Sequence, residues 1–236
     1  MKAFLSGLLL LLLSPVAWAG DELASGKMAD GTSVPYVLTT GGGKPAYAVI
    51  LMPGGGGVLS PRLHSDGSVA FNMGDNFAIR TRGLFAEGPF VAAATDATST
   101  PDRILAIVAD LQRRYPGVKV YVAAFSLGTN ATMALAKPLD GKVAGFVHMS
   151  SMNAIANLDP RGLKSRHVIV LHNGDICPAT SPSNGTASNK KYGTALIVME
   201  GGRSVGHECG PVAHHGFYGV ERETVDKIKQ WITAGG

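Results

Sequence analysis

Ser126 is a candidate nucleophile because of where it lies in the sequence. Within the pentapeptide AFSLG, it follows an apolar run at residues 118–123 and precedes a helical pattern at residues 129–137. The pentapeptide approximates G-x-S-x-G, in which a sharp strand-to-helix turn raises a serine hydroxyl above the carboxyl edge of a sheet. Ala124 replaces the first glycine of that pattern but is still small, as the close approach of helix and strand requires. The context therefore predicts a nucleophilic serine.

A second serine, Ser204, matches the same pattern letter for letter in GRSVG at residues 202–206. It also follows an apolar run, but Cys209, Gly210 and Pro211 come soon after it instead of a helix. Because the motif works only at a strand-to-helix turn, Ser126 is the better candidate.

A serine hydroxyl is a weak nucleophile and needs a general base, an acid that orients the base, and donors for the oxyanion. Asp175 is the candidate acid, since it ends the turn after the apolar run at residues 167–172. Asp96 also follows a strand edge, but it precedes the serine and ranks second. Candidate bases are the histidines between the last expected strand and the last helix, namely His207, His214 and His215.

A glycine-rich segment, residues 53–57 (PGGGG), directly follows the apolar run at residues 47–52. Glycines let backbone N–H groups approach a bound oxygen with no Cβ in the way. The amide after the nucleophile, that of Leu127, is the other expected donor. No Gly-Lys-Ser/Thr follows these glycines, so a phosphate-binding loop is disfavoured.

The two cysteines bear on the same arrangement. Cys177 lies two residues after Asp175, and Cys209 lies among the candidate histidines. A disulfide holds its Cα atoms within about 7 Å, so a Cys177–Cys209 bond would bring the acid loop and the histidine loop together. The competing hypothesis is a metal site made of both cysteines and the three histidines, but their spacing fits no common zinc pattern. We therefore predict a disulfide and no bound metal.

Predicted strands and helices alternate along the chain and place these residues. Apolar runs are separated by helical patterns, and several runs are apolar almost throughout, which is typical of strands covered by helices on both faces. This alternation predicts an α/β fold with a mostly parallel sheet. The expected strands are residues 34–38, 47–52, 90–94, 118–123, 143–149, 167–172 and 194–199, and the expected helices are residues 75–87, 101–115, 129–137 and 221–233.

Residues 180–191 are rich in Ser, Asn and Gly and are expected to be an irregular surface segment. No internal repeat and no linker divides the chain. Residues 20–236 are therefore predicted to form a single domain.

Residues 1–19 read as a signal peptide. Lys2 precedes an apolar stretch with six consecutive leucines, and Ala17-Trp18-Ala19 fits a small-x-small cleavage site. The stretch is shorter than the roughly 20 apolar residues that span a bilayer. We expect an exported protein, periplasmic or secreted, that is not inserted in a membrane after cleavage. An oxidising compartment also favours the disulfide.

The composition excludes several other classes. The chain is 45% apolar and only 16% charged, which argues against disorder. Two cysteines are too few for a disulfide-stapled mini-protein or a four-thiolate zinc site. The formal net charge is +4 and the basic residues are scattered, so no nucleic-acid partner is expected.

The order Ser126, Asp175, His215 along an alternating sheet resembles the α/β-hydrolase fold over essentially all of residues 20–236. The sequence also resembles a group of small single-domain hydrolases with P-G-G-x-G, N-F-x-x-R, D-x-C and C-x(4,6)-H-G-F/Y-x-G-x-E segments. These segments stand here at residues 53–57, 76–80, 175–177 and 209–221. In such sequences the matching histidine immediately precedes Gly-Phe/Tyr, so the resemblance selects His215 from the three candidates.

The resemblance implies acyl transfer by an exported serine hydrolase. His215 would deprotonate Ser126, Asp175 would orient the imidazolium, and the amides of Leu127 and of Gly55 with Gly56 would hold the oxyanion. No metal and no organic cofactor are implied. The alternative is a hydrolase-like binding protein that kept the fold and lost turnover.

The expected substrate is a small molecule, namely a modest apolar carboxylic ester, a thioester or a lactone. No long insertion resembles a lid, so residues 57–72 and 150–159 are expected to cover the pocket. Its apolar lining is expected to come from Phe125, Met73, Met149 and Met152.

Overall fold

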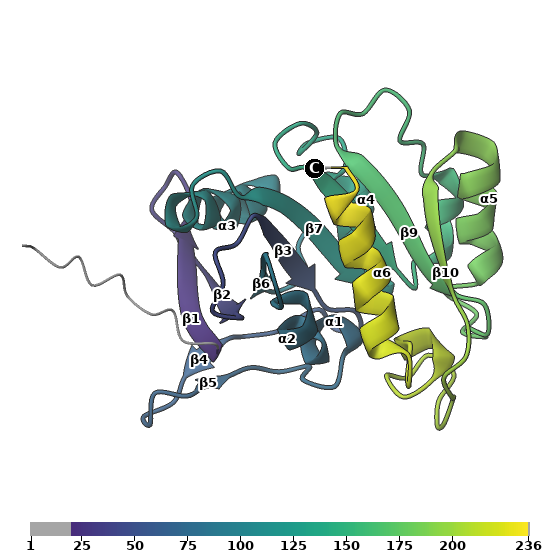
Figure 1. The fold of residues 1–236 in the computed structure, drawn as a ribbon, viewed down its shortest axis with the longest axis horizontal. Helices are drawn as coiled ribbons and strands as arrows, with labels where there is room; N and C mark the ends of the chain where they lie inside the picture. Colours follow the sequence, from purple (N-terminus) through teal and green to yellow (C-terminus); the bar gives the residue numbers. More distant parts are fainter. Residues whose placement is uncertain (1–19, 236) are drawn as a thin grey trace, which may run out of the picture.

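Residues 20–235 are described by a computed structural model, and the predicted signal peptide lies outside these residues. Eight strands form one sheet in the order β1-β2-β6-β3-β7-β8-β9-β10 (Figure 1). Two further short strands, β4 and β5, form a separate hairpin. The strands are β1 Gly20–Lys27, β2 Ser33–Thr40, β3 Tyr47–Met52, β4 Arg62–Leu63, β5 Val69–Ala70, β6 Phe90–Ala94, β7 Lys119–Phe125, β8 Gly145–Met149, β9 Arg166–His172 and β10 Ala195–Met199.

The sheet is mostly parallel, which confirms the predicted fold class. Strands β6, β3, β7, β8, β9 and β10 pair in parallel, whereas β1 pairs antiparallel with β2 and β2 pairs antiparallel with β6. The seven expected strands are all present, with ends shifted by at most two residues. The edge strand β1 was not expected, because its sequence GDELASGK is mostly polar and exposed.

Both faces of the sheet are covered by helices. Alternate residues of a strand face opposite sides. Accordingly, Val49 and Leu51 of β3 pack in one core, while Ala48 and Ile50 pack in the other. The first core is closed by α1 (Phe77–Arg80), α2 (Arg82–Phe85) and α6 (Glu221–Thr233), and the second by α3 (Pro101–Arg114) and α4 (Thr129–Leu135). In Figure 1, α6 crosses the near face of the sheet.

The single helix expected at residues 75–87 is wrong in detail, because the segment forms two short helices that meet at Thr81. The Thr81 hydroxyl donates to the Phe77 carbonyl (2.6 Å), and its backbone leaves helical geometry at φ −94° and ψ 3°. Threonine side chains that bond to a preceding carbonyl compete with a continuing helix.

The irregular segment expected at residues 180–191 is also wrong, because residues Pro182–Tyr192 form helix α5. Pro182 occupies the first turn, and Gly193 ends the helix in a left-handed conformation (φ 72°). The helix lacks an apolar stripe. It packs through Gly185, where a Cβ would come within 3.0 Å of Leu171 and Ile169, and through buried Ser188.

Three 3-10 turns lie in the loops that follow the parallel strands: η1 Ser126–Gly128, η2 Asn153–Asn157 and η3 His214–Gly216. Since the carboxyl ends of parallel strands share one edge of the sheet, the topology gathers the candidate site residues at that edge. Within residues 20–235, no helix combines the length and apolarity needed to cross a membrane.

Candidate active site

Ser126 stands at a sharp turn between β7 and η1. Its φ is +53°, a left-handed conformation that a residue with a Cβ rarely adopts. Gly54 packs directly against this turn, since a Cβ at position 54 would lie 2.8 Å from the Ser126 Cβ and 2.7 Å from the Phe125 carbonyl oxygen. The strained serine is therefore held between the end of β7 and the glycine segment that follows β3.

Small residues make this turn possible. A Cβ at Gly128 would lie 2.3 Å from the Pro53 carbonyl oxygen and 3.5 Å from the Ala124 Cβ. The alanine that departs from the sequence motif is therefore accommodated, because the residue facing it is glycine. Ala124 itself is fully buried.

His215, in η3, lies between Ser126 and Asp175. Its Nε2 atom is 3.0 Å from the Ser126 Oγ, and its Nδ1 atom is 3.0 Å from the Asp175 Oδ2. An ionised carboxylate only accepts hydrogen bonds, so the proton of neutral His215 is assigned to Nδ1 and Nε2 is free to accept the serine proton. Ser150 anchors the backbone of His215, because the Ser150 hydroxyl donates to the His215 carbonyl at 2.7 Å.

Asp175 follows β9 and is buried with both carboxylate oxygens engaged. The Cys177 backbone N–H donates to Oδ1 (2.9 Å), and the Thr180 hydroxyl donates to Oδ2 (3.0 Å). Donors to the ionised form stabilise a buried carboxylate. Thr180 is a site residue that sequence reasoning missed, and its place five residues after the acid carries no recognisable signal.

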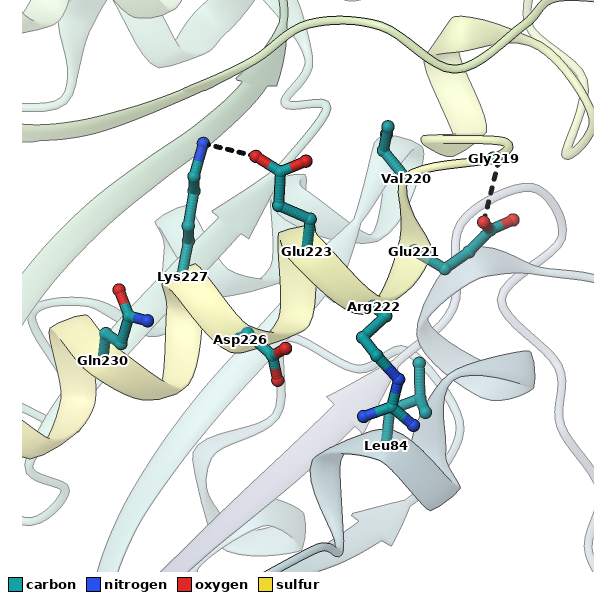
Figure 2. Close-up of a pocket in the computed structure, with 9 residues that line it drawn as sticks. All are labelled: Leu84, Gly219, Val220, Glu221, Arg222, Glu223, Asp226, Lys227 and Gln230. Carbon is teal, nitrogen blue, oxygen red and sulfur yellow. Dashed lines mark hydrogen bonds and ion pairs between the residues drawn. The ribbon is translucent and has the colours of Figure 1, made fainter.

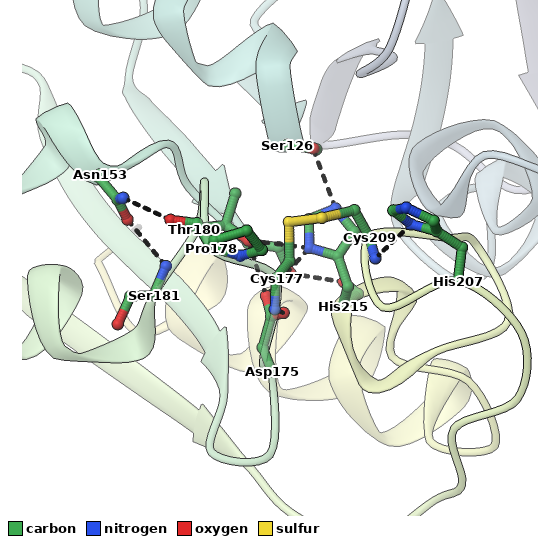
Figure 3. Close-up of a disulfide and its surroundings, with 11 residues drawn as sticks. Ser126, Asn153, Asp175, Cys177, Pro178, Thr180, Ser181, His207, Cys209 and His215 are labelled. Atoms are coloured by element: carbon green, nitrogen blue, oxygen red, sulfur yellow. Dashed lines mark hydrogen bonds and ion pairs between the residues drawn. A yellow bond between two sulfur atoms is a disulfide. The ribbon is translucent and has the colours of Figure 1, made fainter.

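Cys177 and Cys209 form a disulfide with Cα atoms 4.8 Å apart. Figure 3 shows the bond lying over the contact between Asp175 and His215. The disulfide joins the loop of Asp175 to the loop of His215, as predicted from the positions of the two cysteines. With both sulfurs bonded to each other, the alternative metal site has no thiolate ligands. Among residues 20–235, no group of three or more His, Cys, Asp or Glu side chains is arranged to hold a metal ion.

A pocket of about 360 Å³ opens at Ser126 and His215. Its lining is largely apolar and includes the disulfide. Of the side chains expected to line it, Phe125, Met73 and Met152 do so, whereas Met149 is buried in the core. Residues 57–72 do not line it, contrary to expectation. The full lining is Gly55, Met73, Asp75, Asn76, Phe125, Ser126, Leu127, Met152, Cys177, Ala179, Cys209, Pro211 and His215.

The predicted oxyanion donors lie on two sides of Ser126. Gly55 and Leu127 both line the pocket, and Leu127 belongs to the first turn after β7, where N–H groups have no partner within the helix. Gly56 instead lines a neighbouring hollow of about 400 Å³ that shares Gly55 and Leu127. The glycine segment and the serine turn thus line the same pocket.

Several residues with a strained backbone lie at or next to the candidate site. Five residues other than glycine have positive φ within residues 20–235. Ser126 and Met73 line the pocket, Ser150 bonds to His215, and Phe217 ends η3. Such strain persists where the surrounding structure holds it and is common at functional sites.

Comparison with solved structures identifies the architecture. No protein-family model matches the sequence, and no curated protein matches it. An α/β serine hydrolase without a lid from Xanthomonas campestris shares 10% identity (TM-score 0.58), covering 91% of this chain and 98% of its own. An α/β serine hydrolase homologue from Coxiella burnetii shares 15% identity (TM-score 0.59; 92% and 99%). The esterase domain of a Rhodothermus marinus protein shares 11% identity (TM-score 0.56; 89% and 98%). The chain has the α/β-hydrolase fold.

Within this α/β-hydrolase fold, the other two histidines do not contact the serine. The His207 Nδ1 accepts the Cys209 backbone N–H (3.1 Å) in an exposed turn. His214 stacks on His172, with ring centroids 4.5 Å apart, and its Nδ1 lies 3.2 Å from the Gly174 carbonyl oxygen.

The other candidate acid and serine lie elsewhere. Asp96 accepts the backbone N–H groups of Leu59 and Ser60 (2.7 and 3.0 Å) and so holds the loop after the glycine segment. Ser204 is exposed in an irregular segment, and residues 205–213 that follow it form no helix. The hydrolase fold therefore brings together Ser126, His215 and Asp175.

A larger hollow, of about 710 Å³, runs along α6 and is shown in Figure 2. Most of its charged side chains pair with each other or with nearby groups, as in the 2.8 Å Lys227–Glu223 ion pair and the Glu221 carboxylate that accepts the Gly219 N–H. None of the described residues that line it is a serine, cysteine or histidine. The smaller pocket contains the contact between Ser126 and His215 and is therefore the candidate active site.

Proposed function

We propose that this protein is an exported serine hydrolase that cleaves small carboxylic esters through Ser126, His215 and Asp175. The observation that carries the proposal is the continuous contact from Ser126 Oγ through His215 to Asp175, with both links at 3.0 Å, at the mouth of a pocket. These distances are within hydrogen-bond reach, as proton transfer requires. The likeness to serine hydrolases and an esterase domain supports the same chemistry.

The geometry supports the following sequence of steps. Nε2 of His215 takes the Ser126 hydroxyl proton as the oxygen attacks the ester carbonyl carbon, and Asp175 stabilises the imidazolium. The N–H groups of Leu127 and Gly55 hold the oxyanion. The imidazolium then protonates the leaving alkoxide. Water then attacks the acyl-enzyme as His215 takes its proton, and the imidazolium returns that proton to the Ser126 Oγ as the carboxylic acid leaves.

The pocket supports a small and uncharged acyl group. Its volume of about 360 Å³ accepts a small ligand, and Met73, Phe125 and Met152 offer apolar surface. Among the described residues of its lining, Asp75 is the only acidic or basic side chain other than His215. A carboxylate at the mouth repels an anionic substrate, so neutral esters, thioesters or lactones fit best.

Export is supported by two features. The Cys177–Cys209 disulfide is a bond that persists in oxidising compartments, and residues 1–19 have the pattern of a signal peptide. We propose a periplasmic or secreted enzyme that requires no cofactor.

The decisive experiment is hydrolysis of nitrophenyl esters of increasing acyl length by the mature protein and by Ser126→Ala. We expect turnover with short neutral acyl groups, slower turnover with an anionic acyl group, and loss of turnover in Ser126→Ala. A fluorophosphonate probe should label Ser126 and not Ser204 in a peptide map. Absence of both turnover and labelling would refute the enzyme and favour a binding protein of the same fold.

A further inference from the structure

The Thr180 hydroxyl lies against both the acid and the base. Its Oγ1 is 3.0 Å from the Asp175 Oδ2 and 3.0 Å from the His215 Nδ1, and those two atoms are 3.0 Å from each other. The three atoms therefore form a triangle with nearly equal sides, drawn with its hydrogen bonds in Figure 3. Thr180 is 2% exposed, so water does not compete freely for these contacts.

Hydrogen-bond chemistry assigns the protons in this triangle. The hydroxyl has one proton and two lone pairs, and the carboxylate can only accept, so the Thr180 O–H donates to Asp175. The remaining lone pairs of Oγ1 can accept the Nδ1–H of His215. That single proton then has two acceptors at equal distance, the carboxylate and the hydroxyl.

Hydrogen bonds to the backbone around Thr180 hold this residue in place. The Thr180 N–H donates to the Cys177 carbonyl (3.1 Å). Asn153 of η2 accepts the Ser181 N–H (2.8 Å) and donates its side-chain amide to the Pro178 carbonyl (2.8 Å). The position of Thr180 is thus set by contacts that do not involve its own side chain.

We propose that Thr180 is a positioning residue of the acid–base pair. Its hydroxyl oxygen and the Asp175 carboxylate both accept the Nδ1–H of His215. It fixes the carboxylate through its own proton and fixes the imidazole tautomer and tilt through its lone pairs. Thr180 does not line the pocket, so it acts on catalysis through His215 and not on substrate binding. This inference rests on the proposed function, since it assigns a role within the same site.

The experiment compares wild type with Thr180→Val, which keeps the shape and removes the hydroxyl, and Thr180→Ser, which keeps the hydroxyl. Ser181→Ala is the matched control, because it removes a neighbouring hydroxyl whose hydrogen bond within residues 20–235 is to Ser183 and not to the acid–base pair. We expect Thr180→Val to lower kcat about tenfold with KM within about twofold, and Thr180→Ser and Ser181→Ala to stay near wild type. Thr180→Ala replaces Thr180→Val if the latter does not fold.

A second readout does not need turnover. In protein labelled with ¹⁵N-histidine, the Nδ1–H resonance of His215 should move downfield in Thr180→Val, because the proton then belongs to Asp175 alone, and should stay in place in Thr180→Ser. An unchanged resonance and an unchanged kcat in Thr180→Val would overturn the inference, as would equal losses in the Val and Ser variants. If wild type cleaves no ester, the proposed function fails, and the resonance still decides the role of Thr180.

Discussion

Removal of the Cys177–Cys209 disulfide should weaken both the fold and the site. The bond spans 32 residues, from the loop after β9 to the loop before η3. Closing a loop of that length in the unfolded chain corresponds to about 3 to 4 kcal/mol on the chain-entropy model. For a domain of this size, each kcal/mol shifts the melting temperature by about 2 to 4 °C. We therefore expect Cys177→Ala/Cys209→Ala to melt about 6 to 16 °C lower.

The effect on activity follows from what the bond connects. The hydrogen bond from position 177 to Asp175 comes from the backbone N–H, so alanine retains it. The loop that carries His215, however, loses its covalent link to the loop that carries Asp175. A displacement of about 1 Å between catalytic groups costs about a hundredfold in rate, so we expect kcat to fall between about tenfold and a hundredfold.

The assay pairs thermal unfolding with ester hydrolysis, each with and without a thiol reductant. The chain has two cysteines, so a reductant can act on no other bond, and the double variant is the control for unrelated effects of the reagent. Reduced wild type should match the untreated variant, and the variant should not respond to reductant. A double variant with the melting temperature and kcat of oxidised wild type would contradict this role of the disulfide.

Two further predictions concern the turn that bears the serine and the buried histidines. Gly54→Ala should lower kcat about a hundredfold, because its Cβ would lie 2.7 Å from the Phe125 carbonyl oxygen and displace the turn. Gly83→Ala in α2 is the control. A Cβ there meets nothing within 4 Å, so kcat should stay unchanged in the same assay. Stability should fall as pH falls: burial lowers the pKa of His167 from 6.5 to about 4, so between these values the unfolded chain takes up the proton first. His167 alone should cost about 2 kcal/mol at about pH 5 relative to about pH 7.5, measured by urea unfolding, and buried His148, whose pKa is also lowered by burial, should add to the loss. His167→Gln should flatten this dependence, and an equally steep loss in that variant would contradict the assignment.

The parts of the fold that could be predicted are those with a strong local pattern. Strands such as β3 and β7 are buried on both faces and are continuous apolar runs, so they appeared with nearly correct ends. Helix α3 also followed its apolar spacing, since Ile104, Ile107 and Leu111 are fully buried. Elements without such a pattern were missed. Edge strand β1 is mostly polar, and helix α5 packs through a glycine and a serine, not an apolar stripe.

The sequence alone predicts the order of the chemical groups: a serine after one strand, an acid after a later one, histidines before the last helix, and two cysteines that link the acid loop to the histidine loop. Which atoms are in contact follows only from the packed fold. The fold holds His215, the histidine that the family resemblance already selected, at 3.0 Å from both Ser126 and Asp175, and it adds Thr180, which no sequence pattern indicated. The difference lies in the range of the interactions. Turn and strand preferences are read over a few neighbouring residues, whereas hydrogen bonds at 3.0 Å between residues 40 to 89 positions apart depend on how the whole sheet packs.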